Sequence, residues 1–230
     1  MTGASVTTLV VIMAGGRGLR LHPLTEHTPK PMLRVGSKPL LESLIGQFRA
    51  QGFREFVLCV NYKADLIEGY FGSGGGDFNI TYVHETEPLG TAGALRLMMP
   101  PAGPFIVANA DVLTRVDYAE LVMFHVKHSA AATVCLALHQ YQVPYGVVEV
   151  DGERFVDVQE KPIQNYPVAA GVYVMSPSVL RQIPEGRMDM PDLILKVRDA
   201  GGMVMTYPIN EPWLDVGTFA SLEQARSWPA

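Results

Sequence analysis

Short apolar segments alternate with segments of helical spacing along most of the chain. Residues 9–13 are an apolar, largely β-branched run without polar interruption, which is typical of a central strand buried on both faces. A helix ending near Gly52 is predicted next by apolar residues at helical spacing, which are Leu40, Leu41, Leu44, Ile45 and Phe48. Residues 56–60 are again strand-like, so this part of the chain predicts strand, helix, strand.

The same alternation continues toward the C-terminus. Further strands are predicted at 80–83, 105–108, 132–137, 146–150, 155–159, 171–175 and 204–207. Repeated alternation of strands and helices favours an α/β fold with a mainly parallel sheet covered by helices on both faces. Residues 150–153 predict a hairpin with Asp151-Gly152 as its turn signal, which makes the sheet mixed.

Three glycines, Gly15, Gly16 and Gly18, follow the first predicted strand. Glycine lets the backbone approach a ligand closely, so successive N–H groups can converge on phosphate oxygens, and Arg20 and Lys30 add fixed positive charge. The spacing fits neither the Walker A loop nor the dinucleotide fingerprint. A plain strand-to-helix turn would explain the glycines but not the basic segment around Lys30. We therefore predict a phosphate site beyond the carboxyl end of this strand.

Composition and charge narrow the classes of function. A chain of 230 residues with 48% hydrophobic residues can bury one large core, so we expect a single domain over 1–230. The net charge of −5 argues against nucleic acid or an anionic membrane surface as a partner. No apolar stretch approaches the roughly 20 residues that span a bilayer, so the expected location is the cytoplasm. Residues 1–7 are expected to be a tag or the remainder of an upstream segment.

Cysteine and histidine usage gives no sign of a disulfide framework or a zinc site. Cys59 and Cys135 lie inside predicted strands and are expected to be buried, reduced and inert. The histidines show no metal-binding spacing and are interpreted as surface or capping residues; they are His22, His27, His84, His125, His128 and His139.

The glycine segment also resembles the signature of the sugar-1-phosphate nucleotidyltransferases, G-G-x-G-[TS]-R-L-x-P-L-T followed by P-K-P, here Gly15–Thr25 and Pro29-Lys30-Pro31. Later matching segments are Pro88-Leu89-Gly90-Thr91, Asp111, Pro144-Tyr145-Gly146, Glu160-Lys161-Pro162, Ala170-Gly171-Val172-Tyr173 and Trp213-Leu214-Asp215-Val216-Gly217. The resemblance covers nearly the whole chain. It implies a Rossmann-like three-layer α/β/α fold, the nucleotide-diphospho-sugar transferase fold.

The chain looks most similar to a subgroup of that family whose members often carry an upstream CBS regulatory domain. Some of that subgroup are glucosamine-1-phosphate guanylyltransferases that supply nucleotide sugars for cell-surface polysaccharides. Three positions depart from the family pattern. Leu19 replaces a hydroxyl residue of the glycine loop, Ala110 replaces the glycine before Asp111, and Ala169 replaces a common asparagine.

The resemblance implies a reaction in which a sugar-1-phosphate attacks the α-phosphorus of a nucleoside triphosphate and releases pyrophosphate. A phosphate monoester has its second pKa near 6, so it is already an anionic nucleophile at neutral pH and needs no general base. Asp111 and Asp215 look like the family's magnesium ligands, and Mg²⁺ is the implied cofactor.

Site residues are carried over from the family by position. The catalytic group is Arg20, Lys30, Asp111 and Lys161. The nucleotide-binding group is Ala14, Gly15, Gly16, Gly18, Arg20, Lys30, Glu85, Pro88, Gly90, Thr91 and Asp111. The sugar-binding group is Asn109, Tyr145, Gly146, Glu160, Lys161 and Gly171. Glu85 and Glu87 precede Pro88 in the segment that reads the base, and a carboxylate there favours guanine because guanine presents two N–H donors on one edge.

Several alternatives stay open from the sequence. They are uridylyl transfer to an amino-sugar phosphate, a phosphocholine cytidylyltransferase, and a nucleotide-sugar sensor without turnover. A phosphocholine enzyme would need an aromatic cage, for which Tyr145, Tyr166 and Tyr173 are the candidates. The predicted oligomeric state is a monomer or a homodimer.

Overall fold

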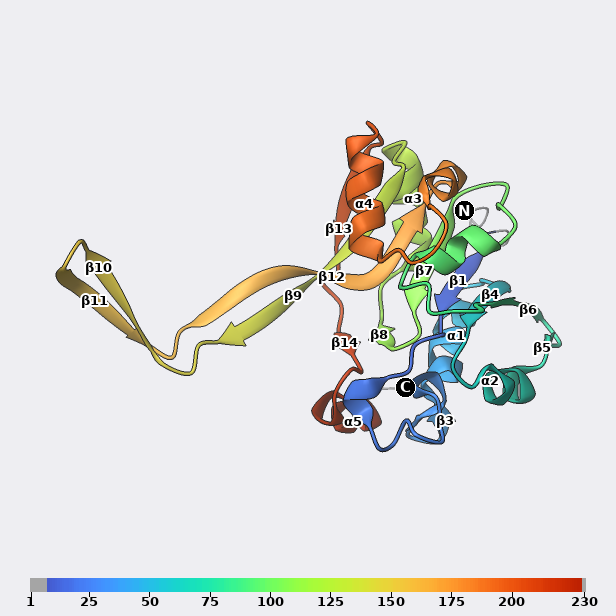
Figure 1. The fold of residues 1–230 in the computed structure, drawn as a ribbon, viewed down its shortest axis with the longest axis horizontal. Coiled ribbons are helices and arrows are strands. Elements are labelled where there is room, and N and C mark those ends of the chain that lie inside the picture. The colour runs from blue at the N-terminus through green and yellow to red at the C-terminus, as the bar shows by residue number, and fades with distance from the viewer. Residues whose placement is uncertain (1–7, 229–230) are drawn as a thin grey trace.

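A mixed sheet of eight strands forms the centre of the computed structural model, which describes residues 8–228 (Figure 1). The strands are β1 (Val10–Met13), β2 (Arg34–Val35), β3 (Lys38–Pro39), β4 (Glu55–Val60), β5 (Gly74–Gly75), β6 (Phe78–His84), β7 (Phe105–Asn109), β8 (Val112–Thr114), β9 (Ala132–Gln142), β10 (Gly146–Asp151), β11 (Arg154–Glu160), β12 (Ile163–Met175), β13 (Val204–Pro208) and β14 (Trp213–Asp215). The helices are α1 (Leu40–Ala50), α2 (Ala64–Phe71), α3 (Tyr118–Lys127), α4 (Met190–Asp199) and α5 (Phe219–Arg226). Short 3-10 helices span Leu19–Leu21, Lys30–Met32, Gly93–Leu97 and Pro177–Gln182.

The main sheet has the strand order β13-β9-β12-β7-β1-β4-β6-β5. Strand β1 pairs in parallel with β4 and β7, β4 pairs in parallel with β6, and β13 pairs in parallel with β9. Strand β12 is antiparallel to both of its neighbours, and β5 is antiparallel to β6. The prediction of a mainly parallel, mixed sheet is therefore confirmed.

Helices cover both faces of this sheet, as predicted. One face packs Val10, Ile12 and Leu58 of the strands against α1, α2 and α3. The other face packs Val11 and Cys59 against α4 and the 3-10 helices Gly93–Leu97 and Pro177–Gln182. The alternation within β1 follows from the two-residue period of a strand, and its apolar run is buried because helices lie on both sides. This is the three-layer arrangement that the sequence predicts.

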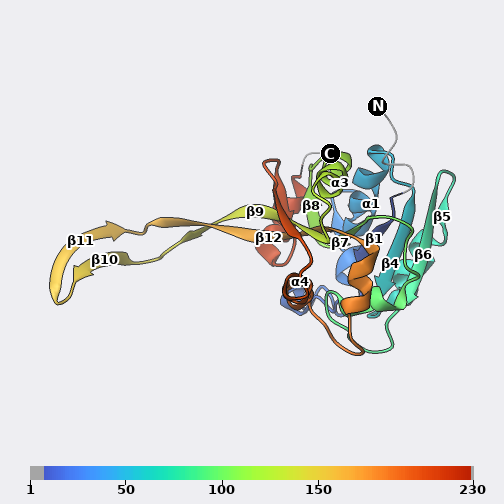
Figure 2. The ribbon, with the colours of Figure 1, turned by 90° about the horizontal axis from the view of Figure 1, so that it is seen from above.

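Two strands are longer than predicted, and the extra residues leave the body of the molecule. The sequence predicts strands at 132–137 and 171–175, whereas β9 and β12 extend to Gln142 and back to Ile163. Beyond them, β10 and β11 form the predicted hairpin, with Gly152 in the turn at φ +60°. We call residues 138–167 the arm. In Figures 1 and 2 it projects as a long twisted ribbon, with only its root near the other elements.

Both cysteines are buried, as predicted, and burial raises the pKa of Cys59 to about 12 and that of Cys135 further still. The interpretation of all six histidines as surface or capping residues is wrong for His125. This side chain is buried between α3 and the sheet, with Nδ1 2.9 Å from Thr133 Oγ1 and Nε2 3.1 Å from Ser176 Oγ. The two hydroxyl groups are hydrogen-bond partners for both ring nitrogens, and these bonds offset the cost of burying a neutral imidazole.

Acid is expected to destabilise the protein through His125. Burial lowers the pKa of His125 from 6.5 to about 4, so between these values the unfolded chain binds the proton and the folded chain does not. Stability should therefore fall as the pH drops from 6.5 toward 4, by about 2 kcal/mol at pH 5. Urea unfolding of wild type and His125→Gln at pH 7 and pH 5 measures this contribution, with the exposed His139→Gln as the control. An unchanged pH dependence in His125→Gln would assign the effect to other groups.

None of the helices within residues 8–228 is long and apolar enough to cross a membrane. Residues 1–7, for which the sequence predicts a tag or an upstream remainder, lie outside the described residues.

Candidate active site

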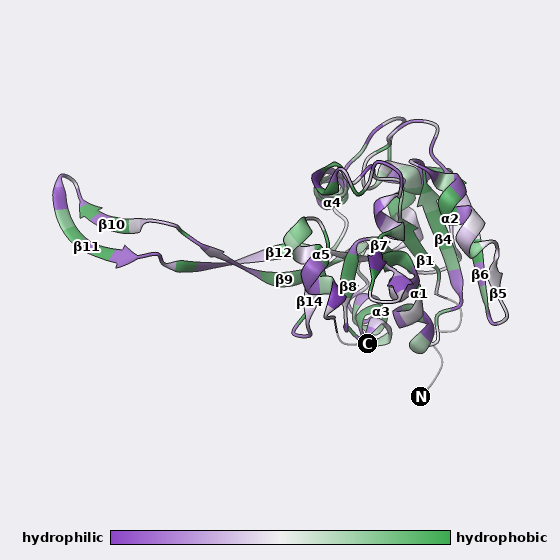
Figure 3. Ribbon diagram, turned by 90° about the horizontal axis from the view of Figure 1, so that it is seen from below, coloured by the Kyte–Doolittle hydropathy of each residue, from purple (hydrophilic) through white to green (hydrophobic). Residues whose placement is uncertain are grey.

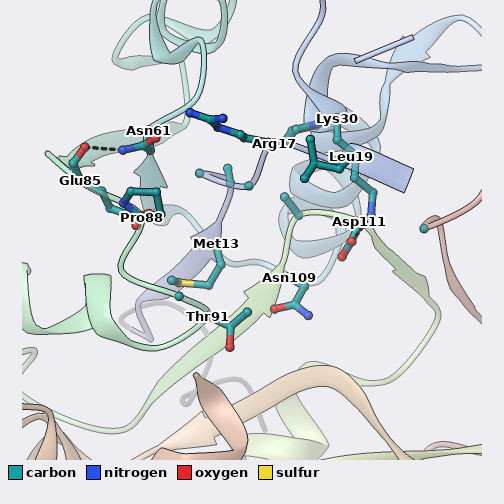
Figure 4. Close-up of a pocket in the computed structure, with 18 of the residues that line it drawn as sticks. Met13, Arg17, Leu19, Lys30, Asn61, Glu85, Pro88, Thr91, Asn109 and Asp111 are labelled. Atoms are coloured by element: carbon teal, nitrogen blue, oxygen red, sulfur yellow. Dashed lines mark hydrogen bonds and ion pairs between the residues drawn. The ribbon is translucent and has the colours of Figure 1, made fainter. Parts of the chain in front are cut away.

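A pocket of about 560 Å³ opens beyond the carboxyl ends of the parallel strands β1, β4 and β7 (Figure 4). Met13 ends β1 and Asn109 ends β7, and the two residues are register partners. Asn61 follows β4, so three neighbouring strands deliver residues to the same edge. A ligand site at this edge is what an open α/β sheet predicts.

The glycine segment forms one wall of the pocket. Within the described chain, the backbone N–H groups from Gly15 to Gly18 donate no hydrogen bond, so they are available to an anion. Gly18 has φ +63°, and a Cβ built on it would lie 2.9 Å from Lys30 Cβ and 3.0 Å from Thr25 Cγ2. Thr25 Oγ1 also donates to Gly18 O at 3.1 Å. This close approach holds the loop against the segment that carries Lys30.

Two carboxylates and two cations meet beside this loop. Strand β8 pairs with β14 so that Asp215 lies opposite Val112, next to Asp111, and Val216 N donates to Asp111 O at 2.9 Å. Lys30 Nζ forms an ion pair with Asp111 Oδ2. On the other side, a Cβ built on Gly217 would lie 2.8 Å from both Arg20 Nη2 and Asp215 Oδ1, so a side chain there would clash with both groups.

Burial and charge both bear on Asp215. Its pKa is raised chiefly by burial, and then by the nearby Asp111 carboxylate, with Lys30 and Arg20 opposing the shift. One oxygen of each carboxylate, Asp111 Oδ1 and Asp215 Oδ1, is buried without a hydrogen-bond partner among the described residues. Buried carboxylate oxygens without partners need an explanation, and two neighbouring ones fit a hard cation such as Mg²⁺, which uses few carboxylates and completes its shell with water and phosphate oxygens.

No cluster of three or more His, Cys, Asp or Glu suited to a metal ion occurs in residues 8–228. A metal ion at this pocket would therefore have to bind through the two carboxylates of Asp111 and Asp215.

Glu85 lies at the opposite end of the pocket. A Cβ built on Gly15 would lie 2.5 Å from Glu85 Oε1, Leu89 N donates to Glu85 Oε2 at 3.0 Å, and Asn61 Nδ2 donates to the Glu85 carbonyl at 2.7 Å (Figure 4). Burial raises the pKa of Glu85, and the bond from Leu89 opposes this shift. The carboxylate is thus fixed in place beside the glycine loop. Glu87, the other acid considered for this role, does not line the pocket.

The third wall comes from a segment that the sequence analysis did not single out, residues 186–189 before α4. Met188 N donates to Leu89 O at 2.9 Å, and Ala92 N donates to Met188 O at 3.0 Å. Asp189 Oδ1 accepts from Thr91 N at 3.1 Å, and this bond is the main cause of the lowered pKa of Asp189. The loop around Gly90 and Thr91 is therefore shaped by a segment almost a hundred residues away in the chain.

Replacing Asp189 is expected to weaken nucleotide binding without removing a group that performs chemistry. Asp189→Ala removes the acceptor for Thr91 N, so the loop around Thr91 loosens and the nucleotide Kd should rise about tenfold, the effect of one lost charged hydrogen bond. Isothermal titration calorimetry measures Kd, and Asp192→Ala, an exposed carboxylate on α4, is the matched control. An unchanged Kd in Asp189→Ala would show that the loop keeps its shape without this contact.

All eleven predicted nucleotide-binding residues come together here, with Asn109 of the predicted sugar-binding group. The pocket is lined by Ala14, Gly15, Gly16, Gly18, Arg20, Lys30, Glu85, Pro88, Gly90, Thr91, Asn109 and Asp111, and Asp215 adjoins it through Gly217. Gly171, at φ +72°, touches the pocket indirectly, since a Cβ built on it would lie 2.8 Å from Asn109 Nδ2.

The other predicted sugar-binding residues lie elsewhere. Tyr145, Gly146, Glu160 and Lys161 belong to the exposed arm, and none of them lines the pocket. Their assignment to the sugar stays a prediction.

Nine further residues line the pocket although no site role was predicted for them: Met13, Arg17, Leu19, Pro31, Asn61, Ala110, Arg187, Asp189 and Gly217. For Asn61 a signal existed, because a polar residue directly follows a buried strand. Arg187 and Asp189 gave none, since only the tertiary fold brings them to the pocket. Two of the departures from the family pattern, Leu19 and Ala110, line the pocket, and Leu19 is 74% exposed.

A glycine loop with free N–H groups, paired carboxylates and two cations at the carboxyl edge of a Rossmann-like sheet are typical of α/β proteins that bind nucleotides. The family model described as Nucleotidyl transferase matches residues 9–228. The chain belongs to this family.

Several relatives carry more specific names. The chain is 34% identical over 222 residues to a mannose-1-phosphate guanyltransferase of Yarrowia lipolytica, and 34% identical over 220 residues to a probable mannose-1-phosphate guanylyltransferase 1 of Oryza sativa subsp. japonica. Each match covers 90% of this chain and 60% of the relative. The chain thus spans about 60% of the length of these relatives.

Solved structures show the same fold. A putative glucose-1-phosphate thymidylyltransferase from Bacillus anthracis, in complex with a sucrose, matches with a TM-score of 0.77 and 22% identity, over 95% of this chain and 94% of that one. HddC from Yersinia pseudotuberculosis, complexed with GMP-PN, matches with a TM-score of 0.72 and 23% identity, over 95% and 98%.

Proposed function

We propose that this protein is a sugar-1-phosphate nucleotidyltransferase that condenses GTP with a hexose- or amino-sugar-1-phosphate to give an NDP-sugar and pyrophosphate. The observation that carries the proposal is the juxtaposition of free loop N–H groups with the Lys30–Asp111 pair in one pocket, which Asp215 adjoins through Gly217. The names of the relatives, mannose-1-phosphate guanyltransferases, support both the reaction class and GTP.

The triphosphate binds along the glycine loop. The N–H groups of residues 15–18 hold phosphate oxygens, while Arg20 and Lys30 balance the charge of the triphosphate and of the departing pyrophosphate. Phosphoryl-type transfer requires little covalent chemistry from the protein, so alignment and preorganised charge account for most of the rate.

The attacking group is a phosphate oxygen of the sugar-1-phosphate. It is mostly dianionic at neutral pH, so no protein base is required. It needs a cation instead, to offset the repulsion between two phosphates. Lys161 is the residue we assign to this phosphate, with Glu160, Tyr145, Asn109 and the backbones of Gly146 and Gly171 facing the sugar.

Mg²⁺ fits the carboxylate pair. Asp111 and Asp215 would hold it, because each has a buried oxygen without a protein partner among residues 8–228. A bound Mg²⁺ supplies Lewis-acid stabilisation of phosphate charge. Lys30 neutralises Asp111 in the structure and is available to turn toward phosphate.

Guanine is favoured by Glu85. This carboxylate is immobilised by Leu89 N and lies against Gly15, and it can accept from the N1–H and N2 amine of guanine. Uracil offers a single N–H flanked by carbonyls and makes a poorer partner. We place the reaction in the cytoplasm, in nucleotide-sugar supply for cell-surface polysaccharide, with residues 1–230 as one catalytic domain.

The alternatives receive less support. A phosphocholine enzyme needs an aromatic cage, yet Tyr173 is buried in the core while Tyr145 and Tyr166 lie on the arm, so these three rings form no cage. A sensor without turnover has no need for paired carboxylates beside the phosphate loop. Uridylyl transfer differs only in the base and acceptor contacts and is tested directly.

Pyrophosphate release with Mg²⁺ tests the proposal. GTP, UTP, CTP and dTTP are each combined with mannose-, glucose-, glucosamine- and N-acetylglucosamine-1-phosphate. The expected result is release that requires both substrates and is fastest with GTP. Preference for UTP would move the assignment to the uridylyl alternative. If no substrate pair releases pyrophosphate while GTP still binds, the result would contradict turnover and favour the sensor.

A further inference from the structure

Arg17 is a cation of the pocket to which the family signature gives no role. The signature G-G-x-G leaves this position open, so no function is carried over to the Arg17 side chain. The residue lies in the glycine loop between Gly16 and Gly18, lines the pocket and is exposed. Its role therefore has to be inferred from its surroundings in the structure.

Arg17 differs from the other three cations that line the pocket in having no acidic partner. Each of the others has a carboxylate near it, and the pairs are Lys30 with Asp111, Arg187 with Asp189, and Arg20 with Asp215. Within residues 8–228, the Arg17 side chain makes no ion pair and no hydrogen bond. The positive charge of Arg17 is therefore left for a ligand of the pocket.

The backbone on both sides of Arg17 is held in place. Tyr62 N donates to Gly15 O at 3.3 Å, and a Cβ built on Gly15 would lie 3.2 Å from Asn61 Cβ. At the other end of the loop, Thr25 Oγ1 donates to Gly18 O at 3.1 Å. Arg17 thus projects from a fixed stretch of backbone whose N–H groups suit phosphate oxygens.

The Arg17 side chain points to the side of the pocket opposite Asn109. The sheet order places β7 on one side of β1 and β4 on the other. Asn109 ends β7, whereas the polar Asn61 follows β4, which is hydrophobic along most of its length (Figure 3). In Figure 4 the Arg17 guanidinium lies toward Asn61, while Lys30 and Asp111 lie on the other side of the loop.

The geometry of the proposed reaction requires a cation on that side. In phosphoryl-type transfer the attacking and leaving oxygens lie roughly in line across the phosphorus. The proposed function puts the sugar at Asn109 and the α-phosphate beside Asp111. The pyrophosphate then leaves on the side opposite Asn109, which is the side of Arg17. A departing anion is stabilised best by a cation that no carboxylate already neutralises.

We propose that the Arg17 guanidinium binds the β- and γ-phosphates of the nucleoside triphosphate and holds the pyrophosphate as it leaves. This inference rests on the proposed function. As the sugar phosphate oxygen bonds to the α-phosphorus, the bond from that phosphorus to the α–β bridging oxygen breaks, and its electron pair leaves with pyrophosphate. The planar guanidinium donates two parallel N–H bonds to phosphate oxygens, which the ammonium group of lysine cannot reproduce.

Binding of GTP, GMP and inorganic pyrophosphate tests the proposal without turnover. Isothermal titration calorimetry with Mg²⁺ and no sugar phosphate measures each Kd. Arg17→Gln should weaken GTP and pyrophosphate about tenfold, the effect of one lost charged contact, and should change GMP by less than about twofold. Arg17→Lys keeps the charge and should give an intermediate loss. Arg181→Gln, which changes an exposed arginine outside the pocket, is the matched control and should bind like wild type.

Two results would overturn the assignment of Arg17. One is a Kd for GTP or pyrophosphate in Arg17→Gln that stays within about twofold of wild type. The other is an equal loss for GMP, which would place Arg17 at the base, the ribose or the α-phosphate. If wild type binds GTP and pyrophosphate but turns over no sugar phosphate, the proposed function is rejected and the binding result for Arg17 stands.

Discussion

Replacing Asp111 by asparagine is expected to lower kcat about 10²- to 10³-fold, the range found when one preorganised electrostatic group is removed from a site of developing charge. Asp111 holds Lys30 in an ion pair through one carboxylate oxygen, and its second oxygen is buried without a hydrogen-bond partner among the described residues. Asparagine keeps the shape but loses the charge that would hold a divalent cation. The same change removes a like charge from Asp215, so the pKa of Asp215 should fall.

Steady-state pyrophosphate release measures kcat, and NMR titration of labelled aspartates measures the pKa of Asp215. Asp192→Asn, an exposed carboxylate on α4, is the control and should keep full activity. Activity in Asp111→Asn within threefold of wild type would remove the carboxylate pair from the mechanism.

Gly18→Ala is expected to lower both stability and activity. The residue has φ +63°, where an L side chain costs about 1 to 2 kcal/mol. The new Cβ would also press on Lys30 Cβ at 2.9 Å and Thr25 Cγ2 at 3.0 Å. Moving Lys30 disturbs its pair with Asp111, so we expect kcat to fall at least about tenfold and the free energy of unfolding to fall by about 2 to 4 kcal/mol.

Gly36 provides the matched control for this strain. It has nearly the same backbone angle, φ +64°, but a Cβ built on it meets nothing within 4 Å. Gly36→Ala should therefore lose only the cost of the backbone conformation and keep full activity. Urea unfolding and pyrophosphate release on both variants separate the two effects. Equal losses in both would show that contact with Lys30 and Thr25 is unimportant.

The body of the fold could be predicted because its signals are local. The apolar run of β1 reflects burial on both faces of the sheet, and the helical spacing of α1 reflects burial on one side of the helix. The Asp151-Gly152 pair is a hairpin signal that depends only on neighbouring residues. The glycine loop was found for the same reason. Its residues are close in sequence, and the strand before them fixes their position at the edge of the sheet.

Features that depend on distant segments escaped prediction. Asp189 reaches Thr91 only through the packing of α4, so no local pattern marks it. His125 is buried because Thr133 and Ser176 supply its hydrogen bonds from other elements. The outer parts of β9 and β12 were missed because polar residues interrupt the apolar pattern there. As a result, no local pattern indicated that Glu160 and Lys161 lie on an arm outside the pocket.

In the proposed reaction, a phosphate oxygen of the sugar-1-phosphate attacks the α-phosphorus of the nucleotide in the glycine-loop pocket. Sugar-1-phosphate labelled with ¹⁸O at its phosphate oxygens tests this most directly, with ³¹P NMR of the products formed from GTP and Mg²⁺. The expected result is an NDP-sugar that keeps all of the label, including the bridging oxygen, together with unlabelled pyrophosphate. Label in the pyrophosphate, or release of inorganic phosphate in its place, would contradict the assignment.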